Sequence, residues 1–350
     1  MKKLIVLVCM VSLLAGVSFG VDCHFQLVGD INGDCKINIA DFVTMAQGWL
    51  VDCDATPGDP LCIPLDIDED GFDAIADCND NDPTIYPGAT EVPNDGIDQD
   101  CDGSDSIDIV WVSINDPGIP WREIFNGEMS KYETTNAQYC QFLNAALASG
   151  DIYVSSNVVY GADGSNLGAD FAGEIYFNTY AASPDSQITY SEGVFSVRSR
   201  DGYDMSNHPV VEVSWYGATA FCNYYGYRLP TEWEWQAVAD YDGSFNYGCG
   251  TTIDFSQANY YDGVNHANSL NLSMYPYTSP VDHFESYGYG MNDMAGNAWE
   301  WTSNLWDPAY SCRVVRGGSW FTSGNNCTVS SRGYFNPSST YGNIGFRVCR

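Results

Sequence analysis

The segment GYGMNDMAGNAWEWT, residues 288–302, gives the clearest fold signal in the chain and contains a candidate cation site. Asp293 and Glu300 supply carboxylates, and Gly296 lets the backbone turn tightly. The carbonyl groups of Gly296 and Ala298 can then face the same ion, and such oxygen ligands suit calcium. The alternative is that the tryptophans of this segment only build the core and that Glu300 is merely hydrogen-bonded.

Further motifs lie on both sides of this segment. Thr135 and Gln138 form a capping box at the start of a helix that we expect to end near Ala148, and Thr231 and Glu234 form a second box. HPVVEVSW is expected to be a short strand followed by a helix to residue 225. Including this stretch, the motifs outside 288–302 are HPVVEVSW (208–215), RLPTEWEW (228–235), RGGSW (316–320) and GFRV (345–348).

In this order the motifs resemble the signature of the formylglycine-generating enzyme (sulfatase-modifying factor) family over residues 107–350. The resemblance implies an α+β, C-type-lectin-like fold with low regular secondary structure and structural calcium. Residues 150–207 would be a surface excursion or set of hairpins. The family's two calcium sites map onto Asp293, Gly296, Ala298 and Glu300, and onto Asn259, Tyr260 and Tyr275, with Ser273 in place of the second site's carboxylate.

The copper-dependent oxidases of this family bind copper(I) through two cysteines that follow the Gly-Gly-Ser motif. Here Thr322 stands at the first position and Cys327 at the second. Because a hydroxyl binds a soft ion poorly, copper is not expected as a cofactor. Cys327 is the one candidate catalytic residue that remains, and we predict a non-catalytic domain. If the chain is an enzyme, the resemblance implies a formylglycine-generating oxidoreductase.

The start of the chain indicates export. Lys2 and Lys3 precede an apolar run, so residues 1–20 are predicted to be a signal peptide and the protein to be secreted, extracellular or periplasmic. No later stretch is long enough to span a membrane. The net charge of −33 excludes nucleic acid as a partner and makes calcium the natural counter-charge.

Residues 21–63 contain a twelve-residue loop with the spacing of a calcium site. Its oxygen side chains stand at loop positions 1, 3, 5, 9 and 12, and a lysine stands at position 7, which needs only a backbone carbonyl. The loop resembles a dockerin repeat, which implies docking to a cohesin-bearing scaffold; the alternative is a solvated acidic loop. The expected ligands are Asp30, Asn32, Asp34, Lys36, Asn38 and Asp41.

Residues 64–106 alternate carboxylates with glycines and cysteines. They resemble a short metal-binding motif found between domains of secreted bacterial proteins, in which carboxylates hold calcium and cysteines staple the loop. The alternative is a disordered acidic linker. The expected calcium ligands are Asp66, Asp68, Asp70, Asp98, Asp100 and Asp102.

The thirteen cysteines include Cys9 in the predicted signal, which leaves an even number for an oxidising compartment. The motif resemblance pairs Cys78 with Cys101, and proximity along the chain suggests Cys312 with Cys327. Similarity to a family disulfide suggests Cys222 with Cys349.

Three functions remain open. The first is a binding module for a glycan or protein ligand, with calcium-bound modules that position it and Trp320 as a ligand-binding residue. The second is an exported oxidase that modifies a sulfatase cysteine. The third is a dockerin-tethered component of a polysaccharide-degrading assembly.

Overall fold

The computed structural model describes residues 66–73, 75–92, 97–101, 107–120, 122–168 and 171–350. These residues divide into two compact units. The acidic unit consists of the described residues up to Thr90 together with residues 99–101. The large domain consists of residues 91, 92, 97 and 98 and the described residues from 107 onward.

Two of the three α-helices that the structure describes in the large domain begin at the capping boxes that the sequence predicts. Thr135 and Gln138 form the capping box of α3, whose C-terminal cap Gly150 has a left-handed backbone. Thr231 and Glu234 form the box of α5, and the Ser214 side chain caps α4. The helices are α3 (Asn136–Ser149), α4 (Trp215–Tyr224) and α5 (Glu232–Ala239).

A four-stranded sheet in the order β12-β11-β10-β13 carries the 288–302 motif into the centre of the domain. β10 pairs antiparallel with β11 and parallel with β13, so it is hydrogen-bonded on both edges. Its strands are β10 (Trp299–Asp307), β11 (Tyr310–Arg316), β12 (Gly333–Phe335) and β13 (Ile344–Gly345), and a short 3-10 helix, η2 (Gly324–Asn326), lies between β11 and β12.

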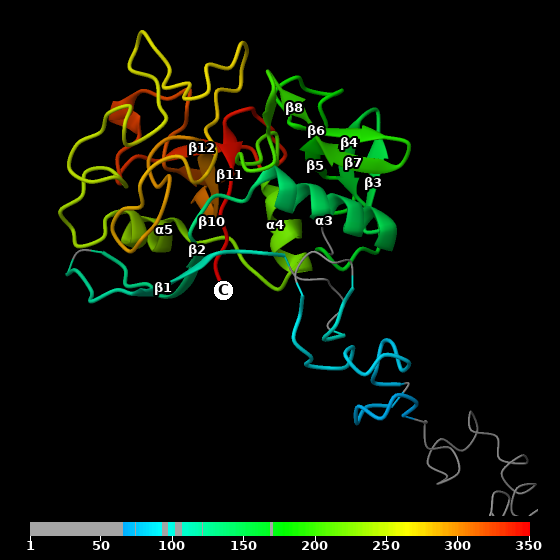
Figure 1. The fold of residues 1–350 in the computed structure, drawn as a ribbon. Helices are drawn as coiled ribbons and strands as arrows, with labels where there is room; N and C mark the ends of the chain where they lie inside the picture. Colours follow the sequence, from blue (N-terminus) through cyan, green and yellow to red (C-terminus); the bar gives the residue numbers. More distant parts are fainter. Residues whose placement is uncertain (1–65, 74, 93–96, 102–106, 121, 169–170) are drawn as a thin grey trace, which may run out of the picture. The chain divides into compact units, whose positions relative to one another are not determined.

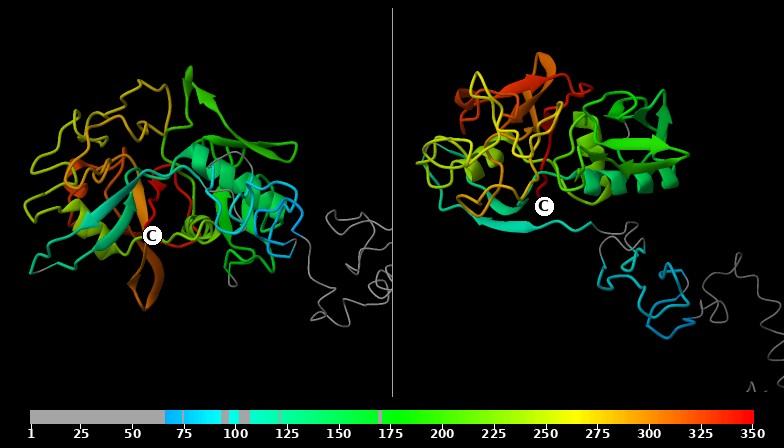
Figure 2. Two further views of the ribbon diagram at one scale, coloured as in Figure 1. Left: turned by 60° about the horizontal axis from the view of Figure 1, so that its bottom comes forward. Right: turned by 45° about the horizontal axis from the view of Figure 1, so that its top comes forward.

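The segment 150–207 forms small antiparallel sheets beside α3 and α4, as Figures 1 and 2 show, which confirms the expected hairpins. These sheets are β3-β4-β5, β6-β7 and β8-β9, and a separate pair, β1-β2, precedes α3. The strands are β1 (Trp111–Asn115), β2 (Asn126–Ser130), β3 (Ile152–Ser155), β4 (Val158–Gly161), β5 (Ile175–Asn178), β6 (Ile188–Ser191), β7 (Val194–Val197), β8 (Ser199–Arg200) and β9 (Tyr203–Asp204).

Long loops make up much of the remaining domain. Residues 240–298, all of which the structure describes, contain isolated bridges but no helix or longer strand. Figure 1 shows them as extended yellow and orange loops. The principal apolar core lies among α3, α4, the hairpin strands and β10, with Tyr139, Phe221 and Phe346 among its buried rings. The α+β fold with low regular secondary structure is therefore as predicted.

Candidate functional site

Asp293 is a buried carboxylate with no hydrogen bond or ion pair among the described residues. It is 7% exposed, and neither carboxylate oxygen has a hydrogen-bond partner. Burial raises its pKa to about 8, an effect that the Arg347 charge opposes and the Glu300 charge reinforces. A buried carboxylate in this state is costly unless a proton or a cation neutralises it. The side chain therefore fits the role of a calcium ligand.

The backbone next to Asp293 turns where the sequence requires glycine. Gly296 has a φ of 82°, and a Cβ atom there would lie 2.3 Å from the carbonyl oxygen of Asn259. No other residue fits this close approach without a backbone shift.

Glu300, by contrast, already has its partners. Arg347 donates from Nε to Oε2 (2.7 Å) and from Nη2 to Oε1 (2.8 Å), and the Trp235 indole N–H donates to Oε2 (2.7 Å). Both members of the ion pair are fully buried. Glu300 is therefore hydrogen-bonded, as the alternative interpretation of the sequence holds, and the Arg347 guanidinium supplies its counter-charge.

Glu133 is a member of this centre that the sequence analysis missed. Its Oε1 accepts from the Ala298 N–H (2.9 Å) and its Oε2 from the Asn297 side chain (2.6 Å). Burial, and then the charges of Asp293 and Glu300, raise its pKa well above the usual range. The one available signal was its position immediately before the capping box of α3. Three buried carboxylates thus share one guanidinium.

The second expected calcium position differs from the family pattern. Asn259 is fully buried, its Oδ1 has no hydrogen-bond partner, and its amide donates to the Tyr277 carbonyl (2.7 Å). The Tyr260 carbonyl accepts from the Ala267 N–H. Ser273 donates from its hydroxyl and its N–H to Asp201, at 2.9 and 2.8 Å. A carboxylate of the 150–207 segment, Asp201, is therefore hydrogen-bonded to the serine that replaces the carboxylate of the family's second site.

The position of the family's copper thiols is occupied by a hydroxyl and a buried thiol. Thr322 is hydrogen-bonded to the Ser319 hydroxyl (2.8 Å). Cys327 is fully buried, and burial raises its pKa to about 12, although backbone N–H groups of Ser319 and Gly296 partly oppose the shift. Cys249 lies in the same small apolar cluster, and burial raises its pKa to about 12 as well. With a hydroxyl at the first position, these residues do not fit the family's copper site.

Two of the three expected disulfides are absent, and Cys78–Cys101 is confirmed. The four cysteines of the other two expected pairs are free thiols in the structure, which corrects both predictions: Cys222, Cys312, Cys327 and Cys349. Cys312 is half-buried on β11, whereas Cys327 is enclosed near Cys249. Cys222 and Cys349 are both buried, and their thiols are close enough to interact electrostatically without a bond.

A cluster of rings lies next to Thr322. Trp320, which was predicted to be a ligand-binding residue, is buried in the structure: it is 3% exposed, and its indole N–H donates to the Gly342 carbonyl (2.9 Å). The exposed rings are its neighbours Tyr275 (47%) and Phe321 (54%), both of which contact Trp320. Half-buried His266 stacks on Phe321.

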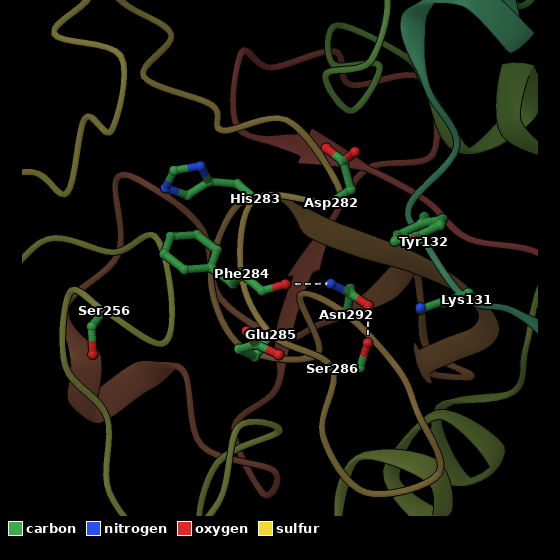
Figure 3. A pocket seen from close by; sticks show the side chains of 9 residues that line it. All are labelled: Lys131, Tyr132, Ser256, Asp282, His283, Phe284, Glu285, Ser286 and Asn292. Atoms are coloured by element: carbon green, nitrogen blue, oxygen red, sulfur yellow. Dashed lines mark hydrogen bonds between the residues drawn. The ribbon is translucent and has the colours of Figure 1, made fainter.

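A polar pocket of about 410 Å³ opens beside the segment that carries Asp293. Figure 3 shows Asn292 between the Phe284 carbonyl, to which its amide donates (2.7 Å), and the Ser286 hydroxyl, from which it accepts (2.9 Å). Charged and aromatic side chains complete the lining, among them Lys131, Tyr132, Asp282, His283 and Glu285.

In the acidic unit, potential ligand atoms of three side chains approach within 4.8 Å of one another. All such groups among the described residues lie between 66 and 101, so the buried carboxylates of the large domain form no comparably tight set. Asp66, Asp68 and Asp70 form one group, as the sequence predicts, and Asp68 forms another with Asp77 and Asp80. Asp98 and Asp100 are half-buried. The 30–41 loop, Asp102 and the signal segment lie outside the described residues.

The fold and these motifs define the class of sulfatase-modifying-factor domains. The family model described as "Sulfatase-modifying factor enzyme 1-like domain" matches residues 123–350, and the chain belongs to this family. A second model, whose name refers to copper binding and whose description is "Putative metal-binding motif", matches residues 77–106. No helix among the described residues is long and apolar enough to cross a membrane.

Three curated relatives illustrate the similarity. The serine/threonine-protein kinase pkn1 of Chlamydia caviae is 32% identical over 50% of this chain and 28% of its own length. The formylglycine-generating enzyme of Streptomyces coelicolor is 35% identical over 40% of this chain and 52% of its own length. The inactive C-alpha-formylglycine-generating enzyme 2 of Mus musculus is 35% identical over 40% and 48%. The chain spans less than two thirds of the length of each.

Proposed function

We propose that the large domain is a non-catalytic extracellular module that binds a saccharide or peptide, and that calcium-bound acidic segments position it after export. The observation that carries this proposal is the pair Thr322 and Cys327. One thiol of the family's copper site is replaced by a hydroxyl, and the other is fully buried. A thiol with a pKa of about 12 is protonated at neutral pH and is a poor nucleophile.

The surface beside this pair supports ligand binding. Tyr275 and Phe321 expose their rings and are held by contacts with Trp320 and His266. Fixed aromatic rings give a large contact area at a small cost in conformational entropy. One relative, the mouse protein, is itself named inactive, which supports a non-catalytic role.

The direct test is to incubate the purified chain with copper(I), oxygen and a sulfatase-derived cysteine peptide, and to look for the formylglycine product by mass spectrometry. We expect no product above that of a Cys327→Ser variant. Product from the unaltered chain that disappears in this variant would overturn the proposal.

Binding is tested on glycan and peptide arrays with Tyr275→Ala. The control is Tyr153→Ala, because Tyr153 is on β3 and has a similar exposed fraction, 44% against 47%. We expect the first variant to lose the array signal and the second to keep it. Equal signals from both would exclude the ring cluster as the binding surface.

A second candidate function rests on Cys249. Because Cys249 and Cys327 are buried in one apolar cluster, Cys249 offers the thiol that position 322 lacks. Two thiolates are suitable ligands for copper(I), and metal binding can displace their protons despite the raised pKa values. In this case the chain is an oxidase with a relocated ligand. Stoichiometric copper(I) binding that is lost in both Cys249→Ser and Cys327→Ser would favour it.

A further inference from the structure

Three carboxylates of the acidic unit converge on one point. One oxygen from each of Asp68, Asp77 and Asp80 lies within 4.8 Å of the others. Asp77 and Asp80 are each only 7% exposed. Asp77 and Asp80 were not among the ligands that the sequence predicts, because spacing along the chain does not reveal burial.

The two oxygens of each carboxylate have different environments. One oxygen accepts a backbone N–H: Asp68 Oδ1 from Asp70 (3.3 Å), Asp77 Oδ1 from Asn79 (2.8 Å), and Asp80 Oδ1 from Ile67 (2.9 Å). The other oxygen, Oδ2, is buried without a hydrogen-bond partner in all three residues. The backbone thus fixes each carboxylate by Oδ1 and leaves Oδ2 available for a ligand.

Among the described residues, the acidic unit has no side chain of its own that could neutralise these oxygens. The described residues of the acidic unit include no Lys, Arg or His. Clustered carboxylates repel one another, and removing them from water without a partner is costly. A bound cation removes both costs.

We propose that Asp68, Asp77 and Asp80 bind one calcium ion through their Oδ2 atoms. Calcium takes six to eight oxygen ligands at about 2.3–2.6 Å, so water and backbone carbonyls would complete its shell. Asp70, which shares a group with Asp68 and also has a buried Oδ2 without a partner, lies next to the site. The proposal does not depend on what the large domain binds or catalyses.

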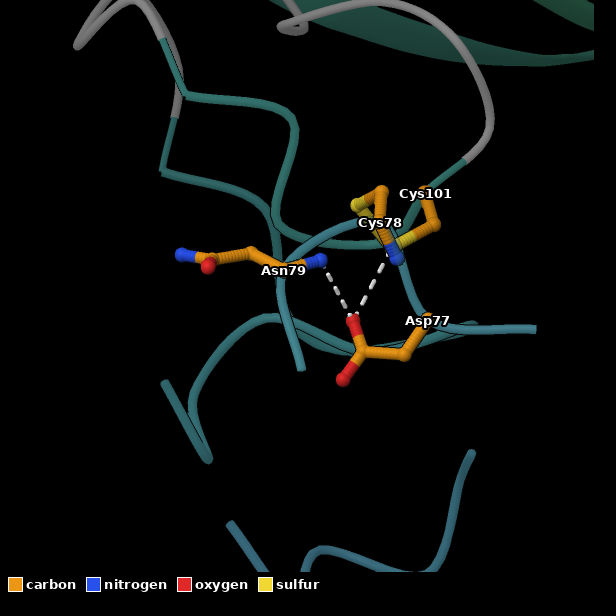
Figure 4. Close-up of a disulfide and its surroundings, with 4 residues drawn as sticks. All are labelled: Asp77, Cys78, Asn79 and Cys101. Atoms are coloured by element: carbon orange, nitrogen blue, oxygen red, sulfur yellow. Dashed lines mark hydrogen bonds between the residues drawn. A yellow bond between two sulfur atoms is a disulfide. The ribbon is translucent and has the colours of Figure 1, made fainter. Parts of the chain in front are cut away.

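The cysteines of this unit argue against copper. Cys78 and Cys101 form a disulfide, so neither is a thiolate. Figure 4 shows the second oxygen of Asp77 pointing away from that disulfide, while the first accepts from Asn79. Soft copper(I) needs sulfur ligands, whereas a set of carboxylate oxygens suits a hard cation. The metal-binding motif of this chain is therefore assigned to calcium.

The experiment uses the full chain, stripped with EDTA and titrated with calcium by calorimetry and native mass spectrometry. Asp77→Asn and Asp80→Asn keep the Oδ1 acceptor for the backbone and neutralise Oδ2. Asp82→Asn is the matched control, because Asp82 lies in the same unit and belongs to none of the ligand groups. Copper is titrated in parallel.

We expect each of the first two variants to bind one calcium fewer, or to bind that ion at least about tenfold more weakly, since a charged ligand is lost. Asp82→Asn should keep the original stoichiometry. Peptide mapping of the Cys78–Cys101 disulfide shows whether a variant is correctly formed. Unchanged calcium binding in both variants would overturn the proposal, as would copper binding that only these variants lose.

Discussion

The acidic unit and the large domain both gather carboxylates, but they neutralise them differently. In the acidic unit, Asp68, Asp77 and Asp80 leave three oxygens without a partner, and the described residues of that unit offer no basic side chain. In the large domain, Arg347 supplies a counter-charge to Glu300 inside a complete apolar core. In the proposal above, the acidic unit takes its counter-charge from a bound ion, whereas the large domain supplies that of Glu300 from its own Arg347.

This difference indicates how each region should respond to its surroundings. A site that relies on an external ion is stabilised by mass action and depends on the calcium concentration. A buried ion pair is independent of the solution but costly to break, because removal of one partner strands the other charge. Asp293 lies between the two cases, since it is buried in the large domain and its oxygens have no partner.

The largest expected effect is on the internal counter-charge. Arg347→Met should lower the free energy of unfolding of the large domain by about 3–5 kcal/mol, because it leaves Glu300 buried without its charge partner. Urea denaturation followed by tryptophan fluorescence measures the loss. Arg350→Met removes an exposed pair with Glu128 and a guanidinium–ring contact with Trp111, both at the surface, and should change much less. Similar losses in the two variants would contradict the assigned role of Arg347.

A smaller effect is expected from calcium removal. If Asp293 holds an ion, EDTA lowers the melting temperature of the large domain by several degrees. Asp293→Asn should abolish most of that difference, whereas Asp282→Asn, the same change at an exposed position, should keep it. Differential scanning calorimetry separates this transition from that of the acidic unit. An EDTA effect that is equal in all three proteins would remove Asp293 from the ion site.

The smallest effect concerns His208, which the core keeps neutral. Burial lowers its pKa to about 4, against about 6.5 in the unfolded chain, and its Nδ1 lies 3.0 Å from the Thr278 hydroxyl. The unfolded state therefore binds more protons between these values, and stability falls as the pH drops from 6.5 toward 4.

Between pH 7 and pH 5 the loss should be about 1–2 kcal/mol. His208→Gln should lose less over this range, whereas the exposed His283→Gln should behave like the unaltered chain. Urea denaturation at the two pH values provides the comparison. If the free energy of unfolding of His208→Gln falls as much between pH 7 and pH 5 as that of the unaltered chain, groups other than His208 cause the loss.

The sequence predicts the features that depend on neighbours along the chain. The capping boxes at Thr135 and Thr231 involve residues three positions apart, so their pattern is visible directly. The backbone turn at Gly296 and the Asp66–Asp70 group are local in the same sense. The family motifs extended this information to the whole domain, since their order specifies one fold.

What the sequence did not reveal depends on tertiary contacts. Glu133 reaches Ala298 across 165 positions, and Asp201 meets Ser273 across 72. The burial of Trp320 was not predicted, because no local pattern distinguishes a buried ring from an exposed one. Of the expected disulfides, Cys312–Cys327 and Cys222–Cys349 are absent, because neither an even cysteine count nor proximity along the chain shows which thiols are adjacent in the fold.

The double pairing of β10 has a consequence for motion. Glu300 lies on a strand with a neighbour on each edge, β11 on one and β13 on the other. Local opening of the loops at 240–298 leaves both neighbours in place. The backbone amide of Glu300, where β10 is paired on both edges, should therefore exchange with deuterium more slowly than those of Leu305 and Asp307, where only β11 pairs with the strand.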